Sequence, residues 1–400
     1  MKENLRRAAG SLLVVGLGGA ELTNLECAWL KLVRPAGIIL FRRNIEDARQ
    51  TRALLGEATG VCAAHSFRCV DVEGGAVDRL RDALAPMPSA QAVAQAALRL
   101  SWDTWSPTLS VAAATTRKDG APSLSKALGH PNELAREHGE LIARGVTAFG
   151  FNTTLAPVLD LALPASAGVM GTRAAAATAA GVVEYARGFV AGLAGHGVAG
   201  CGKHFPGLGG GALDSHLETP AIQRSGGDLW RDDLAPYREL RGELPMVMVS
   251  HAAYPDTPGK NRPASVSPYW ITTVLRKRIG YRGIAFSDDL EMGGILKFMP
   301  IEEAAVAAIR AGMDLLEICH SPELILRAYE ALIAEGERSG AFSRLLVGRA
   351  GQTARQRAKL FAGGVPAALS ARQFEALRAR ILRFGEAVEK AQPTAEAQPA

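Results

Sequence analysis

The stretch Val198-Ala-Gly-Cys-Gly-Lys-His-Phe205 is a short apolar run that ends in polar residues, and it indicates the fold. Longer stretches with helical period separate it from similar runs. These are LLVVG from Leu12, GIILF from Gly37, FRCVDV from Phe67, TLAPVLDL from Thr154, PMVMVSH from Pro245, GIAFSDD from Gly283 and MDLLEIC from Met313. Short buried strands that alternate with helices are typical of a parallel α/β protein. Eight such runs favour a closed (β/α)8 TIM-type barrel, although periodicity alone does not decide closure.

The pattern predicts one barrel domain over residues 1–385. Helical period is clearest at residues 45–57, 132–144, 174–192 and 301–311. Residues 101–127 exceed what a strand-to-helix connection needs, so we expect an insertion there. The polar segment 386–400 is expected to be a disordered tail.

Composition excludes several classes of protein. The 45 basic and 40 acidic residues are mixed along the chain, and no basic stripe with interleaved aromatic residues occurs. We therefore expect no nucleic-acid partner. No apolar run reaches the roughly 20 residues that span a bilayer, so we expect no membrane segment either.

The five cysteines form no CxxC pair and are odd in number. This argues against a disulfide framework and a zinc site, and it fits a reducing compartment. We therefore expect a cytoplasmic protein. Export is the alternative, because Lys2, Arg6 and Arg7 precede an apolar segment as in a secretory signal. That segment also reads as the first buried strand.

Polar side chains gather where the expected strands end. Examples are Asp71, Asp160, Lys203 with His204, Ser250 with His251, and Asp288 with Asp289. In a closed parallel barrel these ends meet at one mouth, which carries the active site. The sequence therefore predicts a polar site there.

Two stretches offer catalytic groups. After Lys203 and His204, a glycine-rich loop leads to Asp214-Ser-His216, in which the carboxylate can orient the imidazole and favour its protonated form. Taken alone, an Asp-x-His is as easily a surface pair. The run from Gly283 ends in Asp288 and Asp289, one of which can face the mouth because side chains alternate along a strand. A helix N-cap is the alternative interpretation.

Together these motifs resemble glycoside hydrolase family 3, in its β-N-acetylglucosaminidase branch that works in bacterial peptidoglycan recycling. The resemblance covers residues 12–369. Its motifs are GIILFRRN at Gly37, VDVEGGAVDRLR at Val70, APVLDL at Ala156, GKHFPGLG at Gly202, DSHLETP at Asp214, RPASVSPYW at Arg262 and FSDDLEM at Phe286.

The resemblance implies a retaining β-N-acetylhexosaminidase with neither cofactor nor metal, acting on a small carbohydrate or muropeptide. Asp288 matches the nucleophile and His216 the acid/base, which Asp214 orients; Asp289 is then structural. The positions that match sugar-binding groups are Asp71, Arg79, Arg173, Lys203 and His204. His251 matches a position at the mouth whose role stays open.

The chain also departs from the family pattern. Leu208 stands where the family motif usually has a second histidine, and Ala76 replaces an arginine after the two glycines. Arg173 has lost the Ser-Phe-Gly that usually follows it, which weakens the expected support for its side chain.

Two other functions remain open. A metal-dependent barrel hydrolase would gather His204, His216, His251, Asp214 and Asp288 around an ion. However, the His-x-His strand ending typical of such barrels is missing, and Lys203 would lie beside the metal. A catalytically weakened sugar-binding homologue is the second alternative, because of the departures at Leu208 and around Arg173.

Overall fold

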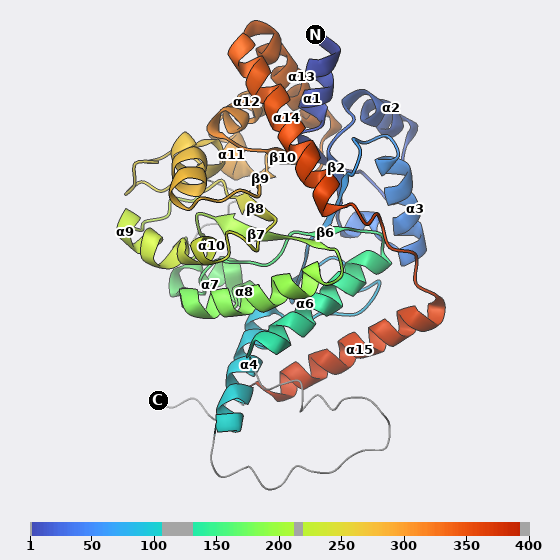
Figure 1. The fold of residues 1–400 in the computed structure, drawn as a ribbon, viewed down its shortest axis with the longest axis vertical. Helices are drawn as coiled ribbons and strands as arrows, with labels where there is room; N and C mark the ends of the chain where they lie inside the picture. Colours follow the sequence, from blue (N-terminus) through green and yellow to red (C-terminus); the bar gives the residue numbers. More distant parts are fainter. Residues whose placement is uncertain (1, 106–130, 212–218, 393–400) are drawn as a thin grey trace.

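The computed structural model describes residues 2–105, 131–211 and 219–392, and a closed barrel of parallel strands lies at its centre (Figure 1). The order around the barrel is β1-β10-β9-β8-β7-β6-β3-β2. The strands are β1 Leu13–Gly16, β2 Gly37–Leu40, β3 Phe67–Val70, β6 Thr153–Thr154, β7 Ala199–Phe205, β8 Met246–Val249, β9 Ile284–Asp289 and β10 Leu315–Ile318. The predicted (β/α)8 barrel is confirmed, and the pairing of β10 with β1 closes it.

Helices surround the barrel. They are α1 Lys2–Gly10, α2 Asn24–Val33, α3 Ala48–Thr59, α4 Ala90–Trp105, α6 Pro131–Ala148, α7 Ala167–Met170, α8 Ala179–Ala194, α9 Gly226–Asp228, α10 Ala235–Glu239, α11 Gly293–Leu296, α12 Ile301–Ala311, α13 Pro322–Arg338, α14 Gly340–Leu360 and α15 Ala371–Lys390. A π-helical segment, Tyr269–Arg278, precedes β9. The helix predicted from residue 174 begins only at Ala179, because the Thr178 hydroxyl accepts the Gly181 N–H and caps it there.

The barrel interior is filled by apolar side chains. Both faces of its strands are covered, so every residue of β1, β2, β8 and β10 is buried. Members of the interior cluster include Cys69, Cys201, Met248, Phe286 and Leu315. At the end where the strands begin, Phe361 packs edge-on against Phe67 with ring centroids 5.2 Å apart. The barrel is therefore packed beneath its mouth.

Two predicted strands differ from the structure. The run from Thr154 gives a strand of only two residues, since Pro157 has no N–H for a ladder, although Val158 still bridges to Lys203. In the run from Phe67, the barrel strand stops at Val70. The next residues form β4 Val72–Gly74, which pairs with β5 Val77–Asp78 in an antiparallel hairpin over the mouth.

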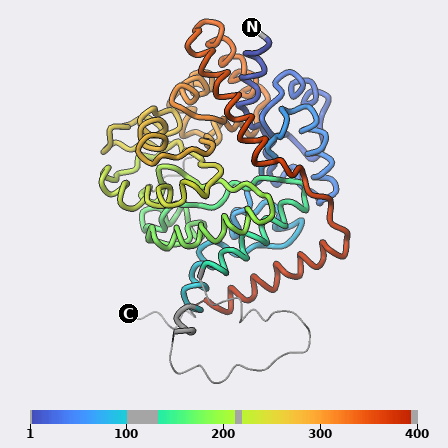
Figure 2. Tube along the Cα trace, viewed as in Figure 1, coloured from blue at the N-terminus to red at the C-terminus, as the bar shows by residue number. Residues whose placement is uncertain are grey.

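The C-terminal helices extend the barrel. Figure 2 shows α14 beside the N-terminal helix α1, with which it is in contact, and then a crossing to α15, which packs on α4 and α6. Residues 386–390, which we placed in a disordered tail, are helical instead because Val388 is buried. Most of the predicted insertion lies outside the described residues. None of the described helices combines the length and apolar character needed to cross a membrane.

Candidate active site

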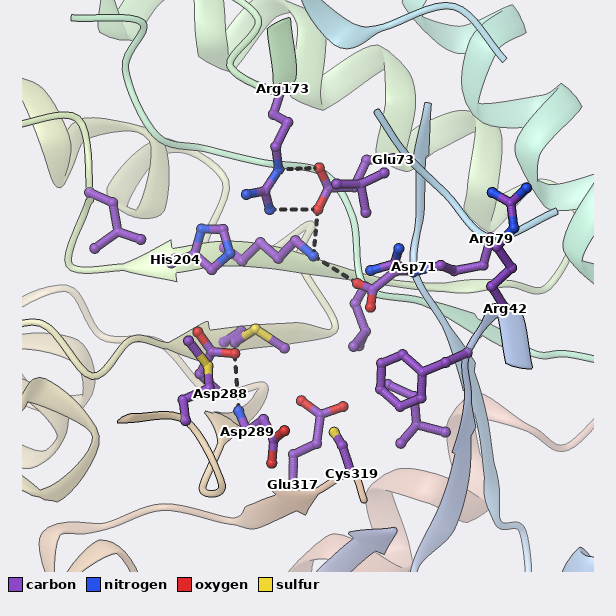
Figure 3. A pocket seen from close by; sticks show the side chains of 18 of the residues that line it. Arg42, Asp71, Glu73, Arg79, Arg173, His204, Asp288, Asp289, Glu317 and Cys319 are labelled. Carbon is purple, nitrogen blue, oxygen red and sulfur yellow. Dashed lines mark hydrogen bonds and ion pairs between the residues drawn. The ribbon is translucent and has the colours of Figure 1, made fainter. Parts of the chain in front are cut away.

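A pocket of about 470 Å³ lies where the barrel strands end (Figure 3). Six of the residues predicted for the site line it, namely Asp71, Arg79, Arg173, Lys203, His204 and Asp288. The structure thus brings together groups from the ends of β3, β7 and β9 and from two connecting segments. Asp214 and His216 lie outside the described residues.

Charged side chains of alternating sign form a chain along one wall of the pocket. The Lys203 Nζ atom lies 2.9 Å from an Asp71 carboxylate oxygen and 2.6 Å from Glu73 Oε1. The Arg173 guanidinium donates two hydrogen bonds to the Glu73 carboxylate, at 2.8 and 2.9 Å. This fork geometry fixes the arginine in orientation as well as position. Arg173 therefore has a buried partner in Glu73, although the residues that follow it depart from the family pattern.

Glu73 reaches the centre of this chain because two glycines follow it. Gly74 and Gly75 have φ values of +91° and +62°, a backbone region that L side chains rarely adopt. A Cβ atom on Gly74 would lie 2.1 Å from the Pro88 carbonyl oxygen. The Glu-Gly-Gly turn can thus fold β4 back over the mouth with the Glu73 side chain inward.

The buried charges stabilise one another. Burial alone would raise the pKa of Glu73, but Lys203 and Arg173 lower that pKa to about 2. Burial would lower the pKa of Lys203, whereas Asp71 and Glu73 raise it above its ordinary value. Both groups are therefore charged at neutral pH, and the wall offers fixed donors and acceptors to the hydroxyl and amide groups of a polar ligand.

Asp160 fixes the orientation of His204. Its carboxylate is fully buried and lies 2.7 Å from His204 Nδ1, and it also accepts the backbone N–H of Leu208 at 2.7 Å. Because a carboxylate only accepts, Nδ1 carries the proton. The ring is thereby held with its Nε2 atom free of this carboxylate, and both His204 and Leu208 line the pocket.

The two carboxyl groups at the end of β9 differ in pKa. Burial would raise the pKa of Asp288, but His204, His251 and the Asp289 N–H lower it, so this carboxyl is ionised. Burial raises the pKa of Asp289 to about 7. The Asp289 side chain accepts the N–H of Glu291 at 3.0 Å. Asp288 therefore presents the anionic oxygen that a nucleophile requires.

His251 lies behind the pocket and is absent from its lining. Its ring nitrogens lie 2.7 Å from the Ser265 hydroxyl and 2.9 Å from the Asp289 carbonyl oxygen. His251 is thus in contact with the end of β9, and it is one of the groups that lower the pKa of Asp288.

Within the described part of the chain, one group of side chains has the spacing of metal ligands, namely Asp289, Glu291 and His320. Glu291 is already engaged, since its oxygens accept the N–H groups of Cys319, His320 and Ser321 at the start of α13. His320 is more than half exposed and its Nε2 atom is 3.9 Å from Asp289. The arrangement is that of a helix cap, and we assign no metal to it.

Three polar residues of the site were not predicted as functional. In the sequence Glu73 is part of a loop motif and Asp160 ends an apolar run, and neither position by itself marks a function. Glu317 of β10 lines the pocket as well, in a run that the sequence presents as apolar. The signal for Glu317 is its alternation with Leu315 and Cys319, which puts all three on the interior face.

The segment that carries Asp214 and His216 is flanked by described residues near the mouth. Leu208, before it, lines the pocket. Thr219, after it, donates a hydrogen bond of 2.6 Å to the Gly294 carbonyl oxygen in α11, close to the end of β9.

Comparison with known proteins gives one consistent result. Residues 5–343 match the family model described as the glycosyl hydrolase family 3 N-terminal domain. A β-hexosaminidase of Alkalilimnicola ehrlichii is 37% identical over 314 residues, covering 78% of this chain and 82% of the relative. A β-hexosaminidase of Bordetella avium is 35% identical, covering 78% of this chain and 81% of that protein.

Solved structures are similar as well. A family 3 β-N-acetylglucosaminidase from Paenibacillus sp. matches with a TM-score of 0.78 and 29% identity, covering 95% of this chain and 68% of that one. NagZ from Neisseria gonorrhoeae in complex with N-trifluoroacetyl-D-glucosamine matches with a TM-score of 0.70 and 28% identity, covering 94% and 98%.

Proposed function

The chain belongs to glycoside hydrolase family 3, and from this premise we propose that it is a retaining β-N-acetylhexosaminidase that removes terminal β-linked N-acetylglucosamine. The observation that carries the proposal is Asp288, an ionised carboxylate at a strand end in a pocket of about 470 Å³, a volume typical of small-molecule sites. The relatives named above are β-hexosaminidases, and one similar structure contains an N-acylated glucosamine.

In the proposed first step, an Asp288 oxygen attacks the anomeric carbon of the sugar. The bond from that carbon to the leaving oxygen breaks, and His216 gives its proton to that oxygen. A covalent glycosyl-enzyme results. In the second step a water molecule gives a proton to His216 and attacks the same carbon, which releases the sugar and restores the Asp288 carboxylate. Asp214 orients the imidazole throughout, as the resemblance implies.

The wall of alternating charge is proposed to hold the sugar. Asp71, Lys203 and Arg173 lie within one hydrogen-bonded chain, so a hydroxyl or amide group finds partners that need no rearrangement. His204 is fixed by Asp160 for the same task. Arg79 also lines the pocket and completes the proposed binding set.

Peptidoglycan fragments are the proposed natural substrates. Arg43 lines the pocket outside the proposed sugar-binding set, and such a cation favours an aglycone that carries carboxylates, as muropeptides do. A cytoplasmic location is part of this proposal, and it is supported by the five cysteines, all of which are free thiols.

Hydrolysis of p-nitrophenyl N-acetyl-β-glucosaminide by the purified protein tests the proposal. We expect Asp288→Asn nearly to abolish turnover, and His216→Ala to lower it by about 10² to 10⁴-fold. Asp289→Asn is the matched control, because it changes the adjacent carboxyl and keeps an oxygen for the Glu291 N–H. It should keep turnover within about tenfold of wild type.

The same assay separates the alternatives. A metal-dependent hydrolase would lose activity in EDTA and regain it with zinc, whereas the proposed enzyme is indifferent to the chelator. A weakened sugar-binding homologue would bind N-acetylglucosamine without turning over the substrate. Wild-type rates in Asp288→Asn would show that the nucleophile is wrongly identified. Mass spectrometry of products from muropeptides and chitooligosaccharides then tests the natural substrate.

A further inference from the structure

Glu317 is a carboxyl group inside the barrel that the proposed mechanism does not use. It is the third residue of β10, all four of which are buried. Side chains alternate along a strand, so Glu317 shares its face with Leu315 and Cys319, both members of the interior cluster. It therefore lies between the apolar filling of the barrel and the pocket above. Figure 3 shows its carboxyl group directed toward the cavity.

The side chain of Glu317 lacks a complete set of partners. Its backbone is fully used, because its N–H donates to the Ser287 hydroxyl at 3.0 Å and its carbonyl oxygen accepts the Leu290 N–H at 2.9 Å. The side chain is only 2% exposed, yet its Oε1 atom makes no hydrogen bond with any residue that the structure describes. Buried polar atoms without partners are rare in folded proteins and call for an explanation.

The surroundings of Glu317 favour the uncharged form of its carboxyl group. Burial raises the pKa of its carboxyl well above the ordinary value, and Asp289, Asp71 and Asp288 raise it further, against the opposing effect of Lys203. A protonated carboxyl carries one O–H donor in addition to its acceptor oxygen. In this form the Glu317 carboxyl at the floor of the pocket can both donate and accept a hydrogen bond.

We propose that Glu317 determines sugar specificity by forming a hydrogen bond with a hydroxyl group of the terminal sugar at the floor of the pocket. This inference rests on the proposed function and adds a binding residue to it. A sugar that lacks this hydroxyl leaves a buried polar group unpaired, and a site built in this way rejects such analogues strongly.

A purely structural role for Glu317 has different consequences. A buried acid that only fills space can be replaced by an apolar side chain of similar size with little loss of stability, or with a gain. Selectivity among sugars would then stay as it is. The two roles are therefore separated by substrate discrimination and not by folding.

The experiment compares p-nitrophenyl N-acetyl-β-glucosaminide with its 3-deoxy, 4-deoxy and 6-deoxy analogues. For the wild type we expect kcat/KM to fall by about tenfold or more with the analogue that lacks the Glu317 partner. Glu317→Leu should lower kcat/KM for the parent sugar by about the same factor. Its kcat/KM for that one analogue should equal that of the wild type. Glu317→Gln should keep most of the wild-type discrimination, because its amide still donates and accepts.

Asp314→Asn is the matched control. Asp314 immediately precedes the same strand and is also buried, but it binds Arg276 and Arg349 and does not line the pocket. This variant should lose stability and keep the wild-type ratios among the four sugars. Glu317→Met serves as a second apolar variant if Glu317→Leu does not fold, as judged by thermal unfolding.

The outcomes are distinct. If a folded apolar variant retains wild-type kcat/KM ratios for all four sugars, this inference is overturned while the proposed function stands. A wild-type protein that does not hydrolyse the parent sugar overturns both. The inference is supported if the apolar variant no longer discriminates between the parent sugar and one deoxy analogue, and if Glu317→Gln still does.

Discussion

At the scale of single residues, Glu73 is the group on which the binding wall depends. It is buried and touches both Lys203 and Arg173. Replacing it by an uncharged residue leaves two cations buried without the anion between them. Its removal is therefore more costly than the loss of an ion pair at the surface.

We expect Glu73→Gln to lower the free energy of unfolding by about 3–5 kcal/mol at pH 7. The pKa of Glu73 is lowered to about 2, below its ordinary value of 4.5, so its contribution is complete above pH 4.5. That contribution is lost as the pH falls from 4.5 toward 2. Denaturant unfolding of both proteins at several pH values measures the difference.

Glu243→Gln is the control for this prediction. Glu243 pairs with Arg187 at 3.1 Å, but both side chains are about two-fifths exposed. Solvent screens such a pair, so the variant should lose less than about 1 kcal/mol. Equal losses in the two variants would contradict the view that burial gives the Glu73 cluster its importance.

Some residues of the site could be predicted from the sequence and others could not. Asp71, Lys203, His204 and Asp288 were predictable because each stands at the end of an apolar run, where a barrel places its site. Glu73 was not, because its partner Arg173 lies 100 residues away and no local pattern joins them. Glu317 was hidden in an apolar run, although its alternation with Cys319 is visible in the sequence.

At the scale of elements, His138 shows how the helices α6, α8 and α15 pack together. This side chain of α6 is fully buried, stacks on Phe384 of α15 and lies edge-on to Phe189 of α8. Its Nδ1 atom is 3.0 Å from the Tyr185 hydroxyl. Burial lowers the pKa of His138 from 6.5 to about 3, so the ring is neutral in the folded state.

We expect His138 to make the protein less stable in mild acid. The unfolded chain binds a proton on this side chain below pH 6.5, whereas the folded chain does so only near pH 3. Stability from this group is thus complete above pH 6.5 and falls by about 1.4 kcal/mol per pH unit as the pH drops toward 3. His138→Leu should lack this component in denaturant unfolding at pH 7, 5 and 4.

His196→Leu is the comparison, because His196 is exposed after α8. It should follow the wild-type dependence on pH. If His138→Leu loses stability with falling pH as steeply as the wild type, the buried neutral histidine is not the cause.

Element positions were predictable to different degrees. Helix α12 has its predicted bounds because Pro300 precedes it and Gly312, with φ of +114°, ends it. The strand from Thr154 was overestimated, since Pro157 interrupts the ladder. The hairpin after Val70 was missed, because a strand that leaves the barrel has the same alternation as one that continues.

At the scale of the whole molecule, the site connects distant parts of one barrel. Its groups come from β3, β7, β9 and β10, which lie around much of the circumference. A ligand that contacts groups from all four strands stabilises the whole closed barrel and not only a single strand. N-acetylglucosamine at 100 times its Kd should therefore raise the free energy of unfolding by about 2.7 kcal/mol.

Thermal unfolding with and without N-acetylglucosamine measures this effect. Glucose is the control sugar, because it lacks the N-acetyl group, and it should shift the Tm less at equal concentration. Equal shifts with both sugars would contradict a site that recognises the N-acetyl group.

The architecture of the whole molecule was predictable from the sequence, but the closure of the barrel was not. Eight alternating units indicated a barrel, yet closure depends on β10 meeting β1, a contact between residues about 300 positions apart. The prediction of a disordered tail from residue 386 was wrong for residues 386–390. These residues continue the amphipathic helix α15, which packs on α6.

The packing of Phe361 against Phe67 has a consequence for turnover. Because the barrel is filled below the pocket, a ligand enters and leaves the pocket from the mouth side. Under the proposed mechanism the aglycone is nearest the exit and departs first. The monosaccharide follows last, and until it has gone the next substrate molecule must wait outside.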